Sequence, residues 1–347
     1  MRVVISIVFL AFLSDLVAQY GVTDSLKMSK ELDQIVITAQ FTPTDTRQTV
    51  NSVRVLNRKT IEQKSAINLQ ELLQTETNIR ISQDAILGST ISINGLKGEN
   101  LKILIDGVPI VGRLNGNIDA GQIPLNTIQK IEIIEGAQSL IYGSEASGGV
   151  INIITRKSQL AALETELNTQ YENNGFRSLA ARVGISKKKW LFQLNGNVTQ
   201  FVPVTDTTGR DQLWNPKKQN SVRGLFRFMP SERSDFRISA NLLTESVDNL
   251  GEKKRIVFKP YAFDDYYFTD RFDVNLFGEH WTKSKNLIQA TLGWNTFSRI
   301  KNSYRFDFDT DFNELLDGMQ DTTTASGIIT RLTYASEKQG KKWNYLL

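Results

Sequence analysis

From about residue 158 onward, the chain alternates apolar and polar positions in runs of about ten residues. The clearest runs are 190–199 and 288–296, and shorter ones lie at 236–242 and 272–276. In the first run, for example, Leu194 and Val198 share one phase while Asn195 belongs to the other. A strand with one face in lipid requires this period of two. The pattern therefore predicts a series of antiparallel transmembrane strands over 158–347.

The connections between these runs alternate in length, which separates a membrane barrel from a soluble β-sandwich. Outer-membrane barrels pair short periplasmic turns with longer extracellular loops, and a sandwich has no reason to keep that order. One connection, at 173–175, is short where a long loop is due. The predicted short turns are 186–189, 230–234, 282–285 and 336–341, and the predicted long polar loops are 202–219, 246–267 and 299–324.

Aromatic residues lie near both ends of the predicted strands, as in the girdles of outer-membrane barrels. The tryptophans beside short turns are Trp190, Trp281 and Trp343, although Trp281 falls on the polar phase; the opposite ends carry Phe201, Phe268 and Phe297. We count eight strands and the start of a ninth at 341–347. Because bacterial barrels have an even strand number and no open edge in lipid, we expect this barrel to be incomplete, as a fragment or a truncated product.

The region before these runs has a different pattern, with short helices and short strands close together. Asn68 followed by Glu71 approximates a capping box and predicts a helix over 69–75. Short Ile- and Val-rich segments bounded by Gly, Asn or Asp predict strands. We therefore expect a small α+β domain over 45–157, with strands at 79–82, 90–94, 101–106, 129–134 and 149–155.

The first residues have the layout of a secretory signal, with Arg2 followed by an apolar run at 3–13 and a small residue, Ala18. The run is too short for a permanent membrane anchor, which needs about 20 apolar residues. We expect a signal peptide over 1–18 and a segment over 19–44 that leads to the domain. That segment contains one isolated β-prone stretch, made of Asp33, Gln34, Ile35, Val36, Ile37, Thr38 and Ala39.

Composition and charge exclude several functions. Lys and Arg exceed Asp and Glu only by 41 to 37, and the one dense basic run, 187–189, reads as a solvated turn, so nucleic-acid binding is not expected. Ser144 and Ser147 lie in no Gly-x-Ser-x-Gly elbow, and His280 is the only histidine. No phosphate-binding Gly-Lys-Ser or Gly-Lys-Thr loop occurs either. We predict no enzyme activity, no catalytic residues and no cofactor.

Two long motifs, ISINGLKGENLKILIDGVPI at 91–110 and IQKIEIIEGAQSLIYGSEASGGVINIITRK at 128–157, resemble the plug domain of TonB-dependent receptors. The segment LQELLQTETNIRI at 69–81 resembles the helix and strand that this family places ahead of them. The resemblance implies a plug followed by a barrel in the outer membrane of a Gram-negative bacterium. Two departures are Asn94 and Glu135, where the family often has a basic residue, and a third is Ala137 in place of Pro. They argue against the family's usual ion pairs between plug and barrel.

The resemblance gives the stretch 33–39 a function. An extended strand ahead of a plug is identified as a TonB box, which a periplasmic partner, TonB, grips through β-augmentation. The simpler alternative is an edge strand of the plug. The Glu-Leu-Asp-Gln-Ile-Val-Ile-Thr-Ala style of the box resembles receptors of Bacteroidota.

The family also implies active import of a scarce small-molecule ligand, such as a ferric siderophore or cobalamin, energised through TonB and its inner-membrane complex. A receptor that senses its ligand without importing it, or a truncated product without activity, are the alternatives. The plug loops 84–88 and 111–117 are candidates for a ligand-facing apex, in which Asp84, Arg113, Asn115 and Asn117 contact the ligand or are simply solvated. Asp264 and Asp265, in a predicted long loop, either bind calcium or face water.

Overall fold

A computed structural model describes residues 35–36, 44–45, 52–84, 86, 88–137, 144–156, 162–204, 210, 214–255 and 259–336. All of them belong to one compact unit that starts at Ile35. The signal peptide predicted over 1–18 and the strand start at 341–347 lie outside the described residues. Among the described residues, no helix is both long and apolar enough to cross a membrane.

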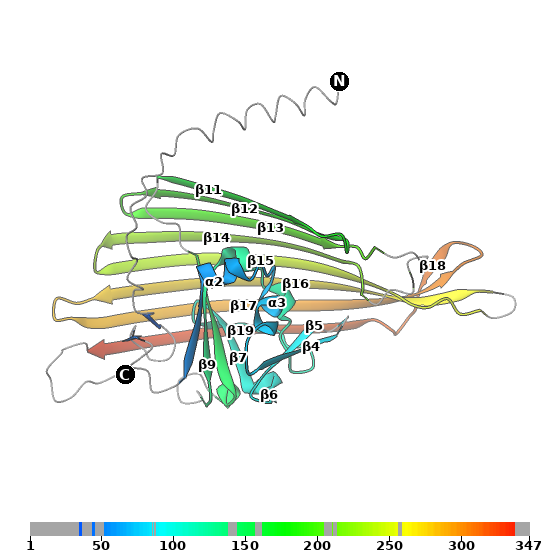
Figure 1. Cartoon of the computed structure of the whole chain (residues 1–347), viewed down its shortest axis with the longest axis horizontal. Helices are drawn as coiled ribbons and strands as arrows, with labels where there is room; N and C mark the ends of the chain where they lie inside the picture. The colour runs from blue at the N-terminus through cyan, green and yellow to red at the C-terminus, as the bar shows by residue number, and fades with distance from the viewer. Residues whose placement is uncertain are drawn as a thin grey trace, which may run out of the picture. The chain divides into compact units, whose positions relative to one another are not determined.

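The α+β domain is built on two small sheets (Figure 1). The five-stranded sheet has the order β3 (Val53–Asn57), β9 (Ile128–Glu135), β10 (Gly149–Thr155), β7 (Leu101–Ile105) and β8 (Val108–Pro109), and its β10–β7 pair is parallel. The three-stranded sheet consists of β4 (Ile79–Asp84), β5 (Gly88–Ile93) and β6 (Leu96–Lys97). The five predicted strands of this domain are confirmed as β4, β5, β7, β9 and β10.

In the described part of the domain, two α-helices and four 3-10 turns accompany the sheets. Helix α3 (Leu69–Gln74) confirms the predicted helix, because the Asn68 side chain accepts from the Glu71 backbone N–H at 3.0 Å and the Glu71 carboxylate accepts from the Ile67 N–H at 3.0 Å. Buried Ile and Leu side chains from both sheets and α3 form the core. The remaining elements are α2 (Arg58–Gln63), η2 (Gly98–Asn100), η3 (Ala120–Gln122), η4 (Leu125–Thr127) and η5 (Ser144–Ala146).

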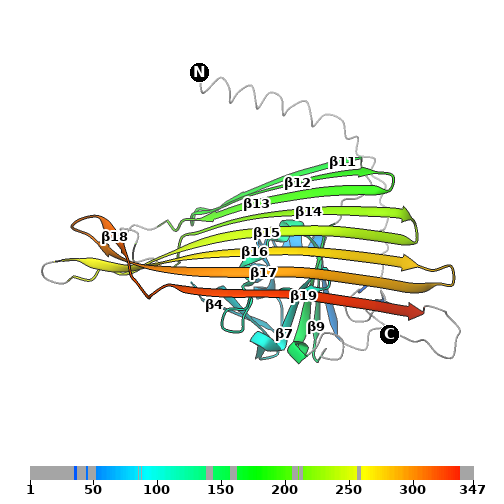
Figure 2. The same ribbon diagram turned by 180° about the vertical axis from the view of Figure 1, so that it is seen from behind.

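A large antiparallel sheet follows, with its strands side by side in chain order (Figure 2). Its strands are β11 (Leu163–Tyr171), β12 (Phe176–Lys187), β13 (Trp190–Phe201), β14 (Lys217–Ser231), β15 (Ser234–Leu250), β16 (Tyr261–Trp281), β17 (Asn286–Asp307), β18 (Phe312–Leu315) and β19 (Asp321–Ser336). Strand β17 pairs with β19 along most of its length and with the short β18 beyond Lys301. The predicted order of antiparallel strands is confirmed.

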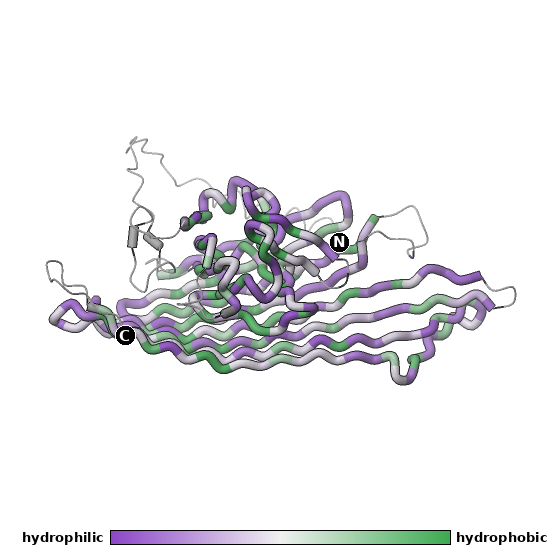
Figure 3. Tube along the Cα trace, turned by 90° about the horizontal axis from the view of Figure 1, so that it is seen from below, coloured by the Kyte–Doolittle hydropathy of each residue, from purple (hydrophilic) through white to green (hydrophobic). Residues whose placement is uncertain are grey.

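The apolar phase of these strands is the exposed phase, which is the reverse of a soluble sheet. Leu194 and Val198 are 45% and 52% exposed, whereas Gln193 and Asn195, on either side of Leu194, are 1% and 2% exposed. Figure 3 shows the alternation along the strands. Apolar side chains outside and buried polar side chains inside are the arrangement of a membrane barrel whose polar interior is filled.

Two predicted loops are wrong because the strands continue through them. Strand β15 runs to Leu250 and β16 starts at Tyr261, so most of 246–267 is sheet. The predicted loop 299–324 contains the end of β17, all of β18 and the start of β19. These strand ends have polar residues in both phases, since they extend past the apolar band. The short turns at 188–189, 232–233 and 282–285 are confirmed, as is the short 172–175 connection.

Phe297 is not part of an aromatic girdle. Its side chain is 2% exposed and lies on the inner phase of β17, next to Asn295 and Arg299, so the expectation for this residue is wrong. Phe268 is 43% exposed and Trp190 is 46% exposed, which agrees with an outward position. Trp343 lies outside the described residues.

Candidate functional site

We call the large sheet β11–β19 the wall, and the inner face of its strands β14–β17 binds the α+β domain through buried polar side chains. Arg271 of β16 donates from Nε to the Gln122 Oε1 atom at 2.7 Å and from its terminal nitrogens to the carbonyls of Val111 and Gly112. Its guanidinium also lies over the ring of Phe297, 4.4 Å from the centroid. One wall cation therefore fixes two separate segments of the domain.

The segment 107–112 fits the wall by shape as well. Gly112 has a φ of +82°, and a Cβ there would lie 2.1 Å from Cγ of Phe297. In the other direction, a Cβ on Gly293 of β17 would lie 2.7 Å from Val108, and a Cβ on Gly327 of β19 would lie 3.1 Å from Val111. Glycines on the wall thus make room for two valines of the domain, and a glycine of the domain makes room for a wall phenylalanine.

A second contact joins Arg223 of β14 to the end of the central sheet. Arg223 pairs with Asp106 at 2.8 Å and donates to the Thr155 hydroxyl at 3.2 Å. Asp106 also accepts from the backbone N–H and the hydroxyl of Thr155, at 2.9 and 2.7 Å. Because the carboxylate is held from both sides, removing Arg223 would take away the wall cation that forms an ion pair with this partly buried anion.

Asp119 is the centre of a third contact and is buried between the domain and the wall. Its carboxylate accepts from the backbone N–H groups of Ser89 and Gly121 at 3.1 and 2.9 Å, and Lys217 of β14 lies at 3.5 Å. Burial alone raises the pKa of Asp119, but the Lys217 cation and these hydrogen bonds outweigh it, so the pKa lies below its ordinary value. Lys217 also pairs with Glu245 of β15 at 2.6 Å. Asp119 is therefore an anion that the wall neutralises.

Gln122 follows Asp119 and links three wall strands. Its amide donates to Glu245 at 2.9 Å, its backbone carbonyl accepts from Gln219 of β14 at 3.0 Å, and its side-chain oxygen accepts from Arg271. Between this region and the wall lies a cavity of about 60 Å³, with room for a few water molecules. The contact on this side is close-packed and strongly hydrogen-bonded.

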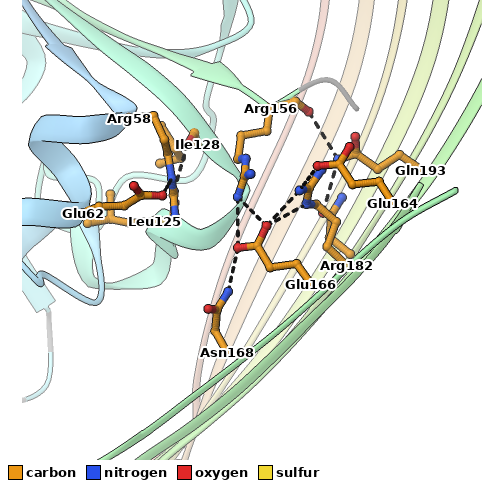
Figure 4. A network of polar contacts seen from close by, with 11 residues as sticks. Arg58, Glu62, Leu125, Ile128, Arg156, Glu164, Glu166, Asn168, Arg182 and Gln193 are labelled. Atoms are coloured by element: carbon orange, nitrogen blue, oxygen red, sulfur yellow. Dashed lines mark hydrogen bonds and ion pairs between the residues drawn. The ribbon is translucent and has the colours of Figure 1, made fainter. Parts of the chain in front are cut away.

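Arg156, at the end of β10, makes a fourth contact with strands β11–β13 (Figure 4). Its guanidinium donates to both carboxylate oxygens of Glu166, at 3.0 and 2.8 Å, and its carbonyl accepts from Gln193 at 3.2 Å. Arg182 of β12 pairs with Glu166 at 2.8 Å and with Glu164. Two arginines and two glutamates therefore meet where the domain ends and the sheet begins.

The predicted apex residues occupy two places. Arg113 donates to the carbonyls of Gly98, Leu101 and Gly116 at 2.9–3.0 Å, which holds its loop in shape. Asn115 has a positive φ of 48°, and its carbonyl accepts from the Asn117 amide at 3.0 Å.

Asp84 lies at the end of β4, where its carboxylate accepts from the Ile86 N–H at 2.8 Å. The Ile86 carbonyl accepts from Arg299, which is nearer the long-loop end of β17 than Asn295 is. No contact with a ligand tests these four residues, so their role stays a prediction.

Only two residues of the predicted TonB box, Ile35 and Val36, are described. They form β1 and pair antiparallel with β2 (Thr44–Asp45). Asp33, Gln34, Ile37, Thr38 and Ala39 lie outside the described residues.

The residues that depart from the family pattern pair within the domain. Glu135 accepts from Arg54 at 2.9 Å and from Asn94 at 3.3 Å. The ion pairs to the wall use other residues. Asp106 and Asp119 are domain anions that pair with wall cations, and Arg156 is a domain cation that pairs with Glu166 of the wall.

Asp264 is not in a solvated loop. It lies in β16, is 1% exposed and forms a two-bond ion pair with Arg210 at 2.5 and 2.9 Å. Asp265 accepts from Ser303 and lies 3.4 Å from Lys301. Within the described ranges, no group of three or more acidic, His or Cys side chains is arranged to hold a metal ion.

Ser147 and His280, considered above as enzymatic groups, have separate partners. The Ser147 hydroxyl donates to Asn100 at 2.9 Å, and His280 Nδ1 shares a hydrogen bond with the Ser234 hydroxyl at 2.9 Å.

Sequence reasoning missed Lys217, Glu245 and Arg271 as interface residues. The alternation of β16 indicates that Arg271 points inward, because its neighbours Asp270 and Phe272 are on the outward phase. One sequence does not indicate which residue an inward side chain contacts.

A small α+β domain packed against the polar inner face of lipid-facing antiparallel strands defines the class of plugged outer-membrane β-barrel proteins. Residues 45–150 match the sequence model of the TonB-dependent Receptor Plug Domain family. The vitamin B12 transporter BtuB of Vibrio cholerae is 36% identical over 126 residues, which cover 36% of this chain and 21% of that protein.

Solved structures agree in fold. The ferric-catecholate import receptor Fiu from E. coli K12 superposes with a TM-score of 0.59 at 15% identity, covering 83% of this chain and 46% of that one. FpvAI in complex with pyocin S2 also gives 0.59, at 11% identity, over 88% of this chain and 53% of that one. Residues 45–150 therefore match a plug domain, and the described chain as a whole shares the fold of plug and barrel strands seen in these structures. The matched segment is about a fifth of the length of that vitamin B12 transporter, and the chain covers about half of these two structures.

Proposed function

We propose that this chain belongs to a receptor that imports a scarce small molecule, such as a ferric siderophore or cobalamin, across the outer membrane with energy from TonB. The observation that supports the proposal is a plug fixed to the inner wall by buried ion pairs. A pore wide enough to need such a plug admits a ligand only when the plug moves, and the outer membrane has no nucleotide supply to drive the movement. The inner-membrane potential is worth about 2.3 kcal/mol per charge per 100 mV, and TonB is the link to it.

On this proposal the stretch 33–39 is the TonB box. An extended segment offers backbone N–H and C=O groups to a partner strand, and β1 shows that Ile35 and Val36 adopt that conformation. The antiparallel partner β2 is exchanged for a strand of TonB. Asp84, Asn115 and Asn117 are proposed to face the ligand, while Arg113 supports the loop that presents the two asparagines.

The test compares two substitutions at one box position in the full-length receptor. Val36→Pro removes a backbone donor and blocks strand pairing, whereas Val36→Thr keeps a β-branched residue. Uptake of radiolabelled cyanocobalamin and of a radiolabelled ferric catecholate is measured in cells with and without TonB. We expect TonB-dependent uptake of one probe, reduced to background by Val36→Pro and retained by Val36→Thr.

Cross-linking of the box to TonB gives a readout that does not depend on the probe. Equal cross-linking and equal uptake for both variants would contradict the box assignment. Binding of a probe without uptake, in cells with intact TonB, would favour a sensing receptor in place of an importer.

A further inference from the structure

A polar space of about 400 Å³ separates one face of the plug from the first strands of the sheet. On the plug side it is lined by α2, including Arg58 and Ile61, and by the η4 segment with Asn126. On the wall side it is lined by Asn168, Ser178 and Asn197, from β11, β12 and β13. Pockets for small ligands have volumes from about 300 Å³, so the volume of this space falls within the range of small-ligand pockets.

The wall differs in chemistry between this space and the rest of the interface. Toward β14–β17 the plug contacts Lys217, Arg223 and Arg271, whose hydrogen bonds run to the plug. Along the space, the amide-bearing wall side chains bond to the wall itself. Asn168 donates to Glu166 at 2.8 Å, Gln170 to Glu172 at 2.9 Å and Asn197 to Thr199 at 3.1 Å.

The Arg156 network lies next to this space on the short-turn side, and Figure 4 shows its contacts. Asn168 lines the space and bonds to Glu166, which in turn holds Arg156 of the plug and Arg182 of the wall. Glu166 pairs in register with Arg182, and both lie nearer to the short β12–β13 turn than Asn168 does. Short turns are on the periplasmic side of such barrels, so the network closes the periplasmic end.

Arg156 can leave the network without leaving a charged side chain of the wall unpaired. Only Arg156 belongs to the plug, and Arg182, which is 6% exposed, remains paired with both Glu164 and Glu166 when Arg156 moves away. Removing one partner of a buried ion pair is costly when the other is left alone, and Arg182 avoids that cost here. Arg156 itself returns to water with its plug strand.

We propose that this space is the path of the ligand past the plug, with the Arg156–Glu166–Arg182 network as its periplasmic gate. The plug then stays attached to β14–β19 while its contact with β11–β13 opens. The uncharged amides and hydroxyls of the wall suit a ligand with a polar surface, because they donate and accept hydrogen bonds without holding an ion in place. The proposal rests on the import function above.

The gate is tested by leakage in cells that lack TonB. Full-length receptor carrying Glu166→Ala is compared with the unchanged receptor and with Asp235→Ala, a matched loss of a carboxylate that pairs with Arg227 at 2.8 Å on the β14–β15 wall. The measurement is the influx of nitrocefin, read as its hydrolysis by a periplasmic β-lactamase. We expect a several-fold faster influx for Glu166→Ala and no change for Asp235→Ala.

A second measurement guards against a variant that assembles poorly. Ser178→Cys, in the space, and Thr269→Cys, on the inner face of β16, are labelled with a polar maleimide, each with and without Glu166→Ala, after heat-modifiable mobility shows that the receptor is folded. We expect Glu166→Ala to speed labelling only at Ser178→Cys. Equal influx and labelling for all variants, or equal increases in Glu166→Ala and Asp235→Ala, overturn the gate. Because TonB is absent, that result leaves the import proposal standing.

Discussion

At the scale of single residues, ion pairs of both signs hold the plug to the wall: plug carboxylates pair with cations of β14, and Arg156 of the plug pairs with Glu166 of β11. Asp106 pairs with Arg223, and Asp119 with Lys217. Asn94 and Glu135 argue from the sequence against the family's usual ion pairs between plug and barrel. The sequence does not indicate which residues form ion pairs in their place. Those depend on the register between two domains that meet only in three dimensions.

Glu71 gives a prediction at this scale. Burial raises the pKa of Glu71, and the nearby Glu172 carboxylate adds to this, while hydrogen bonds from Ile67 and Asn68 oppose it. A carboxyl whose pKa is higher in the folded state stabilises the fold below its unfolded pKa, and that contribution is lost as pH rises through the folded pKa. At neutral pH the charge of Glu71 therefore opposes folding, whereas Glu71→Gln keeps an acceptor without the charge.

We expect backbone amides of α3 to exchange hydrogen more slowly in Glu71→Gln than in the unchanged receptor at neutral pH, and equally below the folded pKa. Hydrogen exchange followed by mass spectrometry at matched pH measures this. Glu62→Gln, at an exposed carboxylate of α2, is the control and should change little. Faster exchange in Glu71→Gln at neutral pH would show that the charge supports the helix.

At the scale of elements, the prediction was correct where residues close together in the sequence determine the structure. The Asn68–Glu71 cap defined α3, and a period of two defined β13 and β17. The prediction was wrong around Asp264 and Tyr266, because these strand ends carry polar residues in both phases, such as Asp264 and Asp265, and so lose the apolar phase. Phe297 was misplaced in the prediction. It lies three residues after the outward Trp294, and in a strand of period two this spacing puts it on the inner phase of β17.

The fit of segment 107–112 against the wall predicts an engineered disulfide. A Cβ on Gly327 would lie 3.1 Å from Cγ1 of Val111, so the two Cβ atoms fall near the spacing of about 3.5–4.5 Å that a disulfide needs. The chain has no cysteine of its own. We expect the pair Val111→Cys and Gly327→Cys to form a disulfide on mild oxidation, seen as a mobility shift that a reductant reverses.

Val111→Cys with Gly224→Cys is the control, because Gly224 shares the outward phase of Val222 and Phe226. Adding Gly112→Ala should lower the disulfide yield, since a Cβ there meets the Phe297 ring and displaces the loop. Full yield with Gly112→Ala would contradict the packing described here.

At the scale of the whole molecule, the exposed apolar phase predicts which substitutions the membrane resists. Leu276 of β16 is 40% exposed and lies within the apolar band, whereas Asn313 of β18 lies on the extension beyond it. Leu276→Arg should cost about 2–4 kcal/mol in the free energy of unfolding from lipid vesicles, the range for a cation on the lipid face near the bilayer midplane. Asn313→Arg should cost nothing measurable in the same denaturant titration. Equal effects of the two would mean that Leu276 does not face lipid.

Strands β16 and β17 have 21 and 22 residues, whereas β12 has 12. A membrane crossing uses about 9–11 residues, so roughly ten residues remain, and at about 3.3 Å per residue they form an arm about 33 Å long. Arg210 braces it, with its guanidinium on Asp264 and within 4.7–4.9 Å of the Phe306 and Phe308 rings. Because the strands of such barrels tilt by about 35–45°, the arm rises above the membrane by less than its own length. On the import proposal, this arm is the part of the barrel that a ligand from outside meets first.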